Sequence, residues 1–435
     1  MKYISTKNIS APVSLKDAVL SGIPEDGGLY LPERIPTLTP QQIKALSTLS
    51  FEEIAQIMAS EFLSTDIPSG EIRDIVANSM NLDVKLTQLS QGMSILETFH
   101  GPTMAFKDFG ARFMARLMSY LIEGDERELT ILVATSGDTG SAVASGFLGI
   151  PGIRVVILYP SGKVSPSQEK QLTTQGQNIQ ALEVSGNFDD CQRLVKRAFA
   201  DRDLRQRLLL SSANSINIAR LIPQSFYYAF TSGQLSRNSG EFVISVPSGN
   251  FGNLTAGLMA KRMGVPIKHF IASTNSNDVF PEYLKSGTFK PRPSDQTISN
   301  AMDVGDPSNL SRIRYLFDDD INRIRAEISS WSFDDIKTRE MIRQIFNKYD
   351  YIIDPHTAVG ILGLEKYQEV HQSTLPGVVI STAHPAKFPE SVEPVIGKKI
   401  PVPPQLAQYL KRKKQAVQMS TEYEDFRQYL RDALD

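Results

Sequence analysis

The 435-residue chain is poor in cysteine and has no large excess of charge of either sign. Its single cysteine, Cys191, excludes an internal disulfide framework and a cysteine-based metal cluster, and it fits a reducing compartment. Basic and acidic residues number 46 and 48, and the net charge of -2 gives no overall field that favours nucleic acid or an anionic membrane. We therefore expect a small-molecule partner, with neither nucleic acid nor membrane bound.

Several familiar signals are also missing. No stretch of about 18 apolar residues free of charged and turn-forming residues occurs, which argues against a membrane-spanning helix. The first residues, MKYISTKNISAPVSL, contain neither the apolar core of a secretory signal nor the arginine-rich pattern of a transit peptide. The patterns H-E-x-x-H, C-x-x-C, G-x-S-x-G and G-x-G-x-x-G are absent, so zinc protease, redox, serine hydrolase and dinucleotide-binding functions lack support. We expect a cytoplasmic protein that requires no metal.

The character of the sequence changes near Leu129. Before it, residues 39–80 repeat apolar positions at helical spacing, and Ser50 with Glu53 forms a possible capping box. After it, helical stretches such as 189–210 and 253–264 alternate with short apolar runs, which are LTILVAT, RVVILYP, IQALEV, EFVISVP, IKHFIAST and GVVISTA. Continuous apolar runs are typical of strands covered on both faces, so the pattern predicts an α/β fold with mainly parallel sheet.

Two glycine-rich turns follow predicted strands and precede predicted helices. The first, VPSGNFGN at residues 246–253, allows backbone N–H groups to approach an anion at a helix N-terminus, as a phosphate site requires. The second, ATSGDTGSAVASGF at residues 134–147, offers hydroxyls and unhindered amides suited to a carboxylate or a phosphate. Each is also readable as a tight turn that simply needs glycine. The occurrence of both in one chain favours anion binding.

Lys107 lies in the stretch HGPTMAFKDFGARFM, at the entrance of a predicted amphipathic helix. The apolar face of that helix consists of Phe109, Phe113, Met114, Leu117, Met118 and Leu121. A partly desolvated lysine has a lowered pKa and is a better nucleophile toward an aldehyde. The plain alternative is a lysine whose stem covers apolar surface while its charge stays in water.

Further cationic and amide groups occur in two segments, PSGKVSPSQEKQLTT at 160–174 and NSINIARLIPQSFYY at 214–228. Lys163 and Arg220 are suited to neutralise a phosphate, arginine by a two-pronged contact. The structural alternative is a solvated loop followed by a helix capped near Asn214 or Ser215. Spacing alone favours that alternative.

Eight motifs occur in the order known from one enzyme family: EDGGLYLPE, HGPTMAFKDFGARFM, ATSGDTGSA, VSPSQEKQLTT, NSINIARLIPQ, VPSGNFGN, DPHTAVG and STAHPAKFPE. With them the chain resembles threonine synthases of the longer, bacterial and fungal type, over most of its length. The resemblance implies a pyridoxal 5'-phosphate enzyme of fold type II, similar to the tryptophan synthase β chain. The expected fold is α/β, with mainly parallel twisted sheets in a large and a smaller domain plus an N-terminal helical layer. The implied reaction is the last step of threonine biosynthesis, which converts O-phospho-L-homoserine and water to L-threonine and phosphate.

The resemblance also implies roles for particular residues. Lys107 matches the lysine that forms a Schiff base with the cofactor and then acts as a general base, and Thr382 matches the hydroxyl facing the pyridine nitrogen. The expected cup for the cofactor phosphate is Ser248, Gly249, Asn250, Phe251, Gly252 and Asn253. The loop expected to bind the α-carboxylate of the substrate is Thr135, Ser136, Gly137, Asp138 and Thr139. Further candidates, for the substrate phosphate, are Lys163, Ser165, Gln168, Asn217 and Arg220.

We expect an N-terminal layer over residues 1–95, a large cofactor-binding domain over 96–118 and 212–435, and a small mobile domain over 119–211. The expected assembly is a monomer or a homodimer. Two alternatives stay open at this point. One is a dehydratase or phospholyase of the same fold acting on a related amino acid, and the other is a catalytically silent homologue that binds pyridoxal phosphate.

Overall fold

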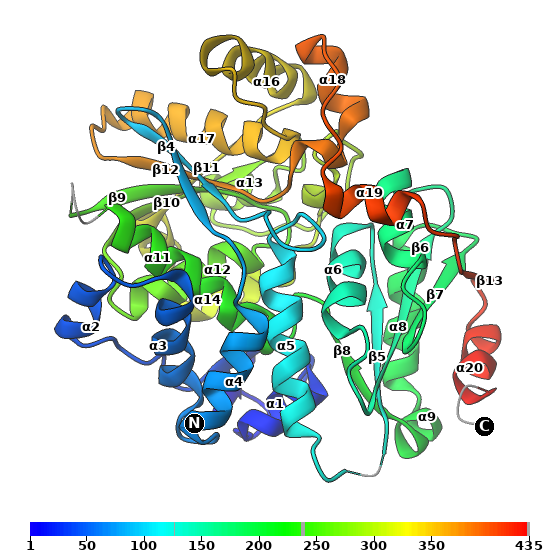
Figure 1. The fold of residues 1–435 in the computed structure, drawn as a ribbon. Coiled ribbons are helices and arrows are strands. Elements are labelled where there is room, and N and C mark those ends of the chain that lie inside the picture. The colour runs from blue at the N-terminus through cyan, green and yellow to red at the C-terminus, as the bar shows by residue number, and fades with distance from the viewer. Residues whose placement is uncertain (126, 236–239, 433–435) are drawn as a thin grey trace.

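The computed structural model describes residues 1–125, 127–235 and 240–432, which form two mainly parallel sheets (Figure 1). The larger sheet has six strands, and all neighbours run parallel except the antiparallel pair β3 and β4 at one edge. In spatial order its strands are β11 (Ile328–Ser332), β10 (Ile267–Thr274), β9 (Phe242–Pro247), β12 (Gly377–Ser381), β4 (Met93–Glu97) and β3 (Lys85–Ser90).

The smaller sheet has five strands, all parallel to their neighbours. Their spatial order is β13 (Val417–Met419), β7 (Ile179–Val184), β6 (Ile153–Pro160), β5 (Leu129–Ala134) and β8 (Leu209–Ser212). Residues of β5 alternate between two cores: Ile131 and Val133 face one, whereas Leu132 and Ala134 face the other. Because both faces are covered, the strand is apolar throughout, as its continuous apolar run predicts.

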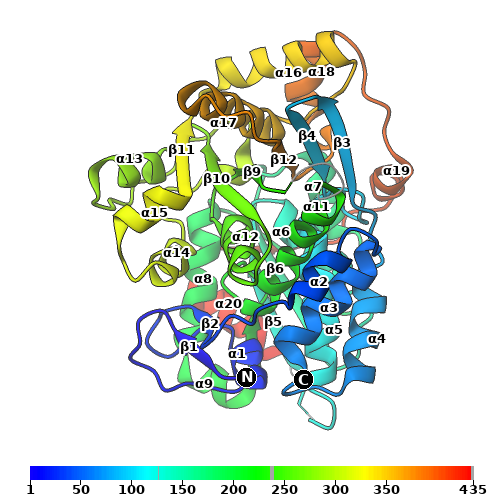
Figure 2. The ribbon, with the colours of Figure 1, turned by 90° about the vertical axis from the view of Figure 1, so that its left-hand side faces the viewer.

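Helices cover both faces of each sheet (Figures 1 and 2). Over the larger sheet lie α17 (Pro355–His371), α16 (Asp335–Tyr349) and α18 (Pro389–Ile396), with α11 (Phe226–Leu235), α12 (Gly252–Arg262) and α14 (Leu310–Leu316) on its other side. The smaller sheet packs with α6 (Asp138–Phe147) and α7 (Pro166–Thr173) on one side, and with α8 (Phe188–Ala200) and α20 (Tyr423–Asp432) on the other. Both sheets are therefore central layers of α/β sandwiches.

The N-terminal part of the chain packs against α5 (Lys107–Leu121). The helix α5 also contacts α6 of the smaller unit, which is the smaller sheet together with the helices packed on it. A Cβ at Gly146 of α6 would lie 2.9 Å from the backbone carbon of Ala111, so α5 and α6 touch at that glycine. The N-terminal elements are β1 (Tyr3–Ser5), α1 (Leu15–Ser21), β2 (Tyr30–Pro32), α2 (Pro40–Ala45), α3 (Phe51–Leu63) and α4 (Ser69–Ser79). The remaining short elements are α9 (Arg202–Arg207), α10 (Ile218–Leu221), η1 (Ile222–Ser225), α13 (Val279–Ser286), η2 (Asn300–Met302), α15 (Ile321–Glu327), η3 (Pro385–Lys387) and α19 (Pro404–Leu410).

Two predicted helices differ from the structure. The stretch 189–210 is divided, because the side chain of Asp201 accepts the N–H groups of Asp203 and Leu204 and starts a new helix, α9. Its last residues form β8, which pairs in parallel with β5. The helix expected to be capped near residues 214 or 215 begins later, with Asn217 as its cap.

The division into domains at residues 95, 118 and 211 stays a prediction. The sheets themselves place β3 and β4 in the larger sheet and β13, near the C-terminus, in the smaller one. Among the helices of the described residues, none has the length and apolarity needed to cross a bilayer.

Candidate active site

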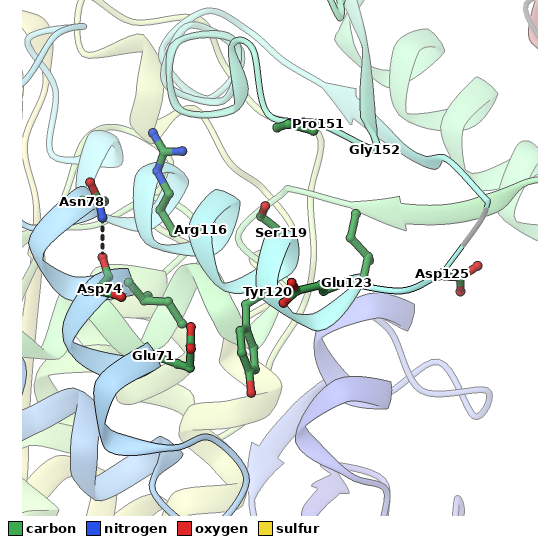
Figure 3. A pocket seen from close by; sticks show the side chains of 12 residues that line it. Glu71, Asp74, Asn78, Arg116, Ser119, Tyr120, Glu123, Asp125, Pro151 and Gly152 are labelled. Carbon is green, nitrogen blue, oxygen red and sulfur yellow. Dashed lines mark hydrogen bonds between the residues drawn. The ribbon is translucent and has the colours of Figure 1, made fainter.

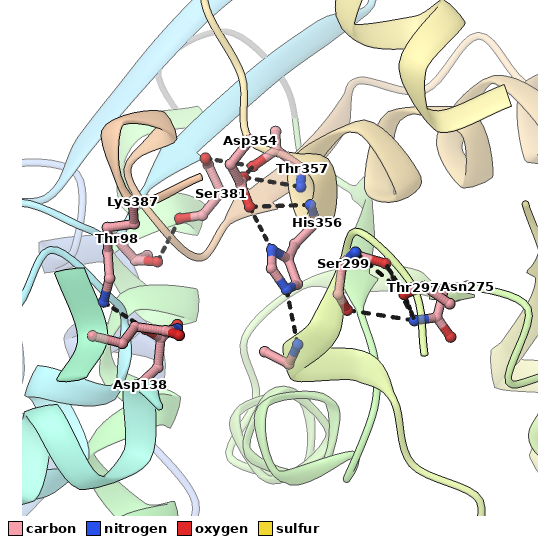
Figure 4. Close-up of polar contacts among 12 residues, drawn as sticks. Thr98, Asp138, Asn275, Thr297, Ser299, Asp354, His356, Thr357, Ser381 and Lys387 are labelled. Carbon is pink, nitrogen blue, oxygen red and sulfur yellow. Dashed lines mark hydrogen bonds and ion pairs between the residues drawn. The ribbon is translucent and has the colours of Figure 1, made fainter. Parts of the chain in front are cut away.

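Three strands of the larger sheet end side by side at one edge of that sheet. Neighbouring strands β4, β12 and β9 run parallel, and Ser381 at the end of β12 pairs with Glu97 at the end of β4. The segments that follow them are joined by hydrogen bonds: both the N–H and the hydroxyl of Thr98 donate to Ser381 O, at 3.1 and 2.7 Å (Figure 4). Open α/β sheets bind ligands outside the carboxyl ends of their strands. This edge is therefore the candidate site.

Lys107 stands beside the segment that follows β12. The N–H of Phe106 donates to Thr382 O at 2.9 Å, and Ala105 forms a bridge with Ala383, so the start of α5 is fixed against Thr382. The hydroxyl of Thr382 has no hydrogen-bond partner among the described residues and is available to a ligand. The fold thus brings together two residues that lie far apart in the sequence and that sequence analysis named as cofactor ligands.

The surroundings of Lys107 favour its neutral amine. Burial lowers the pKa of Lys107 to about 8, the cationic groups of Arg220 and Lys387 act in the same direction, and the Asp138 carboxylate opposes them. A lysine ordinarily titrates near pH 10.4, so this one has a much larger unprotonated fraction near neutral pH. An unprotonated amine is the form that attacks an aldehyde.

The glycine-rich turn after β9 has the geometry of an anion cup. Phe251 has φ of 57° and caps α12, whose free N–H groups begin at Gly252. A Cβ at Gly249 would lie 2.7 Å from Met302 Cα, so only glycine fits there. The side chain of Asn250 is fixed from two sides, since its amide donates to Ser215 Oγ and its oxygen accepts from Ser308 N, both at 2.6 Å.

Asn253 contributes an unused donor to this cup. Its Oδ1 accepts from the hydroxyls of Tyr227 and Tyr228 at 2.7 and 2.8 Å, while its Nδ2 is buried and has no partner among the described residues. A buried donor without a partner is costly unless a ligand satisfies it. Together with the helix N-terminus and the close approach at Gly249, this donor fits a phosphate group.

Hydrogen bonds within the loop after β5 fix the shape of that loop. Thr135 Oγ1 accepts from the N–H groups of Gly137 and Gly140, at 3.0 and 2.9 Å, and is therefore engaged inside the loop. Ser136 and Thr139 are half-buried, and their hydroxyls have no partner within the described part of the chain. These two hydroxyls are the groups that the loop presents to a ligand.

Asp138, at the first position of α6, connects the two sheets. Its Oδ1 lies 2.5 Å from Lys387 Nζ and accepts from Gln168 Nε2 at 2.9 Å (Figure 4). Burial favours the neutral acid, but the nearby ammonium groups of Lys387 and Lys107 outweigh burial and hold the pKa of Asp138 below its usual range. Sequence analysis named Asp138 and Gln168 but did not single out Lys387, although it lies in the quoted stretch STAHPAKFPE.

The other candidates for the substrate phosphate lie in different surroundings. Lys163 is exposed, and Ser165 caps α7 in a capping box with Gln168. Asn217 caps α10 and also donates to Val19 O at 2.9 Å, so its side chain is fully engaged with the backbone. Arg220 is 2 % exposed and donates to Ala213 O, and burial lowers its pKa to about 10. The structure thus brings Gln168 and Arg220 close to Lys107 or Asp138, and it leaves Lys163 at the surface.

A separate pocket of about 470 Å³ lies near the opposite end of α5 (Figure 3). Its polar lining includes Glu71, Asp74, Arg116, Tyr120 and Glu123. Since a helix rises about 1.5 Å per residue, this part of α5 is roughly 15–20 Å from Lys107. The pocket is therefore distinct from the candidate site. No group of three or more His, Cys, Asp or Glu side chains in the described ranges is arranged to hold a metal ion.

Comparison with known proteins places the chain in a family. Three family models match: "Threonine synthase N terminus" over residues 2–80, "Pyridoxal-phosphate dependent enzyme" over 85–382, and "Threonine synthase, C-terminal" over 357–430. The chain is 42 % identical to the threonine synthase of Haemophilus influenzae, with 99 % of each chain covered. It is also 42 % identical to the threonine synthase of Escherichia coli, with 94 % of each chain covered.

Solved structures agree with the sequence matches. The fold superimposes on the pyridoxal-phosphate-bound threonine synthase of Brucella melitensis with a TM-score of 0.93, at 36 % identity and with 99 % of both chains covered. The threonine synthase structure from Escherichia coli gives a TM-score of 0.92, at 39 % identity over both whole chains. The family models, the full-length relatives and the fold agree, and the chain belongs to the threonine synthase family of pyridoxal-phosphate-dependent enzymes.

Proposed function

We propose that this protein converts O-phospho-L-homoserine and water to L-threonine and phosphate, with pyridoxal 5'-phosphate held at Lys107. The observation that carries the proposal is the placement of Lys107 beside Thr382, at the sheet edge where the glycine-rich cup of residues 248–253 also opens. Membership of the threonine synthase family supports the same reaction.

The chain's own groups would hold the cofactor at three points. The N–H groups at the start of α12, the hydroxyl of Ser248 and the amide of Asn253 suit the phosphate. The hydroxyl of Thr382 suits the pyridine nitrogen, and Lys107 Nζ suits the aldehyde carbon. When bound, pyridoxal 5'-phosphate supplies an aldehyde that condenses with amines and a ring that accepts electrons from the substrate α carbon.

Lys107 then has two successive tasks. Its amine would hold the cofactor at rest, and the same amine, once free, would remove the proton from the substrate α carbon. A neutral amine is needed for both tasks, and the burial that lowers the pKa of Lys107 to about 8 provides it. The hydroxyls of Ser136 and Thr139 would hold the α-carboxylate, and Arg220, Gln168 and Lys163 remain our candidates for the substrate phosphate.

Water must reach the β carbon only after phosphate has left. We propose that the smaller unit, which carries the loop 135–139, closes on the bound substrate and excludes bulk water until that step. Once phosphate has left, uncontrolled hydrolysis in place of water addition at the β carbon would give a ketoacid and ammonia instead of threonine.

The reaction is tested by supplying O-phospho-L-homoserine and measuring threonine, phosphate and ketoacid separately. We expect threonine and phosphate in equal amounts. Ketoacid without threonine would instead identify a dehydratase or phospholyase, and no turnover at full cofactor occupancy would identify a silent homologue.

Lys107→Ala should keep the fold and lose both the visible absorbance of the bound cofactor and threonine formation. Lys337→Ala, at an exposed lysine of α16, is the matched control and should change neither. A borohydride-sensitive chromophore that persists in Lys107→Ala would show that another lysine holds the cofactor.

We also propose a cytoplasmic location and a monomeric or homodimeric state. The single cysteine suits a reducing compartment. Light scattering of the purified chain distinguishes one copy from two, and a larger assembly would contradict the proposal.

A further inference from the structure

Lys387 is fully buried, with no exposed surface, in the short helix η3 that follows β12. Its ammonium lies 2.5 Å from Asp138 Oδ1 and donates to Thr103 O at 2.9 Å. Gln171 Nε2 donates to the same carbonyl at 3.2 Å. A buried lysine needs a carboxylate partner, because an unpaired buried charge is costly. Thr103 in turn donates from its N–H and its hydroxyl to Asp108, the residue after Lys107, so the ion pair is tied to the start of α5.

The charged groups around Lys107 leave no carboxylate unpaired for its protonated form. Facing it are Asp138 from α6, Arg220 from α10 and Lys387 from η3. Asp108 on α5 faces both Arg220 and Lys387. Arg112 acts on Asp108 as well, so the cations already outnumber the two carboxylates and a protonated Lys107 would add a further unmatched charge. Asp138 is the carboxylate that opposes the lowered pKa of Lys107, and Lys387 pairs with it.

We propose that Lys387 is a positioning residue for Lys107, because it holds the Asp138 carboxylate in an ion pair and so prevents that carboxylate from pairing with the Lys107 amine. The proposal rests on the proposed function, in which Lys107 works as a free amine. Without Lys387, the Asp138 carboxylate would pair with the other cation that acts on it, which is Lys107. The lysine would then be a stabilised ammonium, unable to attack an aldehyde.

The test measures the protonation of Lys107 itself. Full-length protein freed of cofactor is treated across a pH series with dilute trinitrobenzenesulfonate, which reacts with unprotonated amines, and labelling of Lys107 is quantified by peptide mass spectrometry. In Lys387→Met we expect the labelling midpoint to rise by about one pH unit or more, which is about a tenfold slower labelling at neutral pH. An unchanged midpoint overturns the proposal.

A second background separates pairing from simple repulsion between two lysines. If Lys387 acts by holding Asp138, its replacement in an Asp138→Asn background should shift the midpoint by less than half as much, because no carboxylate is released. Equal shifts in the two backgrounds would mean direct repulsion only and would refute the positioning role. Should Lys387→Met not fold, Lys387→Gln replaces it, since glutamine keeps a donor for Thr103 O without the charge.

The matched control is Lys414→Met. Lys414 Nζ pairs with Glu169 and Glu183 at 2.7 and 2.6 Å, so the same substitution breaks a second lysine ion pair, at a partly exposed position. In Lys414→Met, the pH midpoint for labelling of Lys107 should equal that of the unchanged protein. A shifted midpoint would show that the effect is not specific to Lys387 and would overturn the proposal. The proposed function fails separately, if pyridoxal 5'-phosphate and borohydride do not label Lys107 in the unchanged protein.

Discussion

Gly110 lies almost one turn after Lys107, where α5 crosses Arg220. A Cβ at this position would lie 2.7 Å from Arg220 Nε and 2.8 Å from Arg220 O. The side chain has some freedom to move, but the backbone carbonyl does not. The absence of a side chain at Gly110 therefore lets α5 lie close to α10. This contact helps to fix the position of Lys107 at the start of α5.

We expect Gly110→Ala to lower the free energy of unfolding by about 1–3 kcal/mol, because overpacking outweighs the gain in helix propensity. Cofactor attachment to Lys107 should weaken as well, because the start of α5 must move. Urea unfolding and cofactor titration check both effects. Gly70→Ala in α4 is the control, since a Cβ there meets nothing within 4 Å, and it should be neutral or slightly stabilising. Equal destabilisation by both variants would contradict the packing argument.

At the scale of the element, α3 shows how a local signal starts a helix. Ser50 Oγ accepts from Glu53 N at 3.3 Å, and Glu53 Oε2 accepts from Ser50 N at 2.8 Å, so the predicted capping box is confirmed. Replacing Ser50 by alanine should cost about 0.5–2 kcal/mol of stability, as for other N-caps, with threonine synthesis unchanged. Thermal unfolding measures the effect. Ser64→Ala at the other end of α3 should stay within about 0.5 kcal/mol, and a similar loss there would argue against capping.

Six of the thirteen strands in the described residues can be predicted from local patterns. Continuous apolar runs correctly predict β5, β6, β7, β9, β10 and β12, because parallel strands are buried on both faces. The run KLTQLS of β3 is half-exposed and polar, and it is a strand only because β4 pairs with it. The residues of β8 stand at the end of a helical pattern in the sequence, and they form a strand because β5 pairs with them.

The candidate site shows the same limit. Lys107 and the glycine-rich turns have local signals, a lysine at an apolar helix face and glycines between strand and helix. Lys387 has none, because its partner Asp138 lies on α6, which packs against the other sheet, and only the fold brings the two together. The role of Asn217 as a cap for α10 could likewise not be separated from ligand binding by spacing alone.

At the scale of the whole molecule, the end of the chain returns to the smaller unit. The helix α20 packs there through Phe426, which is fully buried in a core with residues of α8, and Arg427 bonds Asp201 at 2.8 Å. We expect Phe426→Ala to cost about 3–5 kcal/mol locally. Hydrogen exchange should become faster in β7 and α8 and stay unchanged in β9 and β12, because the core that contains Phe426 includes no described residue of the larger sheet. The control is Ile336→Ala, which removes an exposed side chain and should leave exchange unchanged in both sheets. If Phe426→Ala made exchange uniformly faster in both sheets, the two sheets would not be separately stabilised.

The pairing of β13 with β7 also affects how the smaller sheet forms during synthesis of the chain. A ribosome makes residues 179–184 long before residues 417–419, so β7 has an open edge for most of the synthesis of the chain. During that interval the face that α20 later covers is bare as well. Open strand edges and exposed apolar faces are where nascent chains pair with one another. The smaller sheet is therefore begun early and completed only when residues 417–432 have been made, and the growing chain is exposed to aggregation throughout that interval.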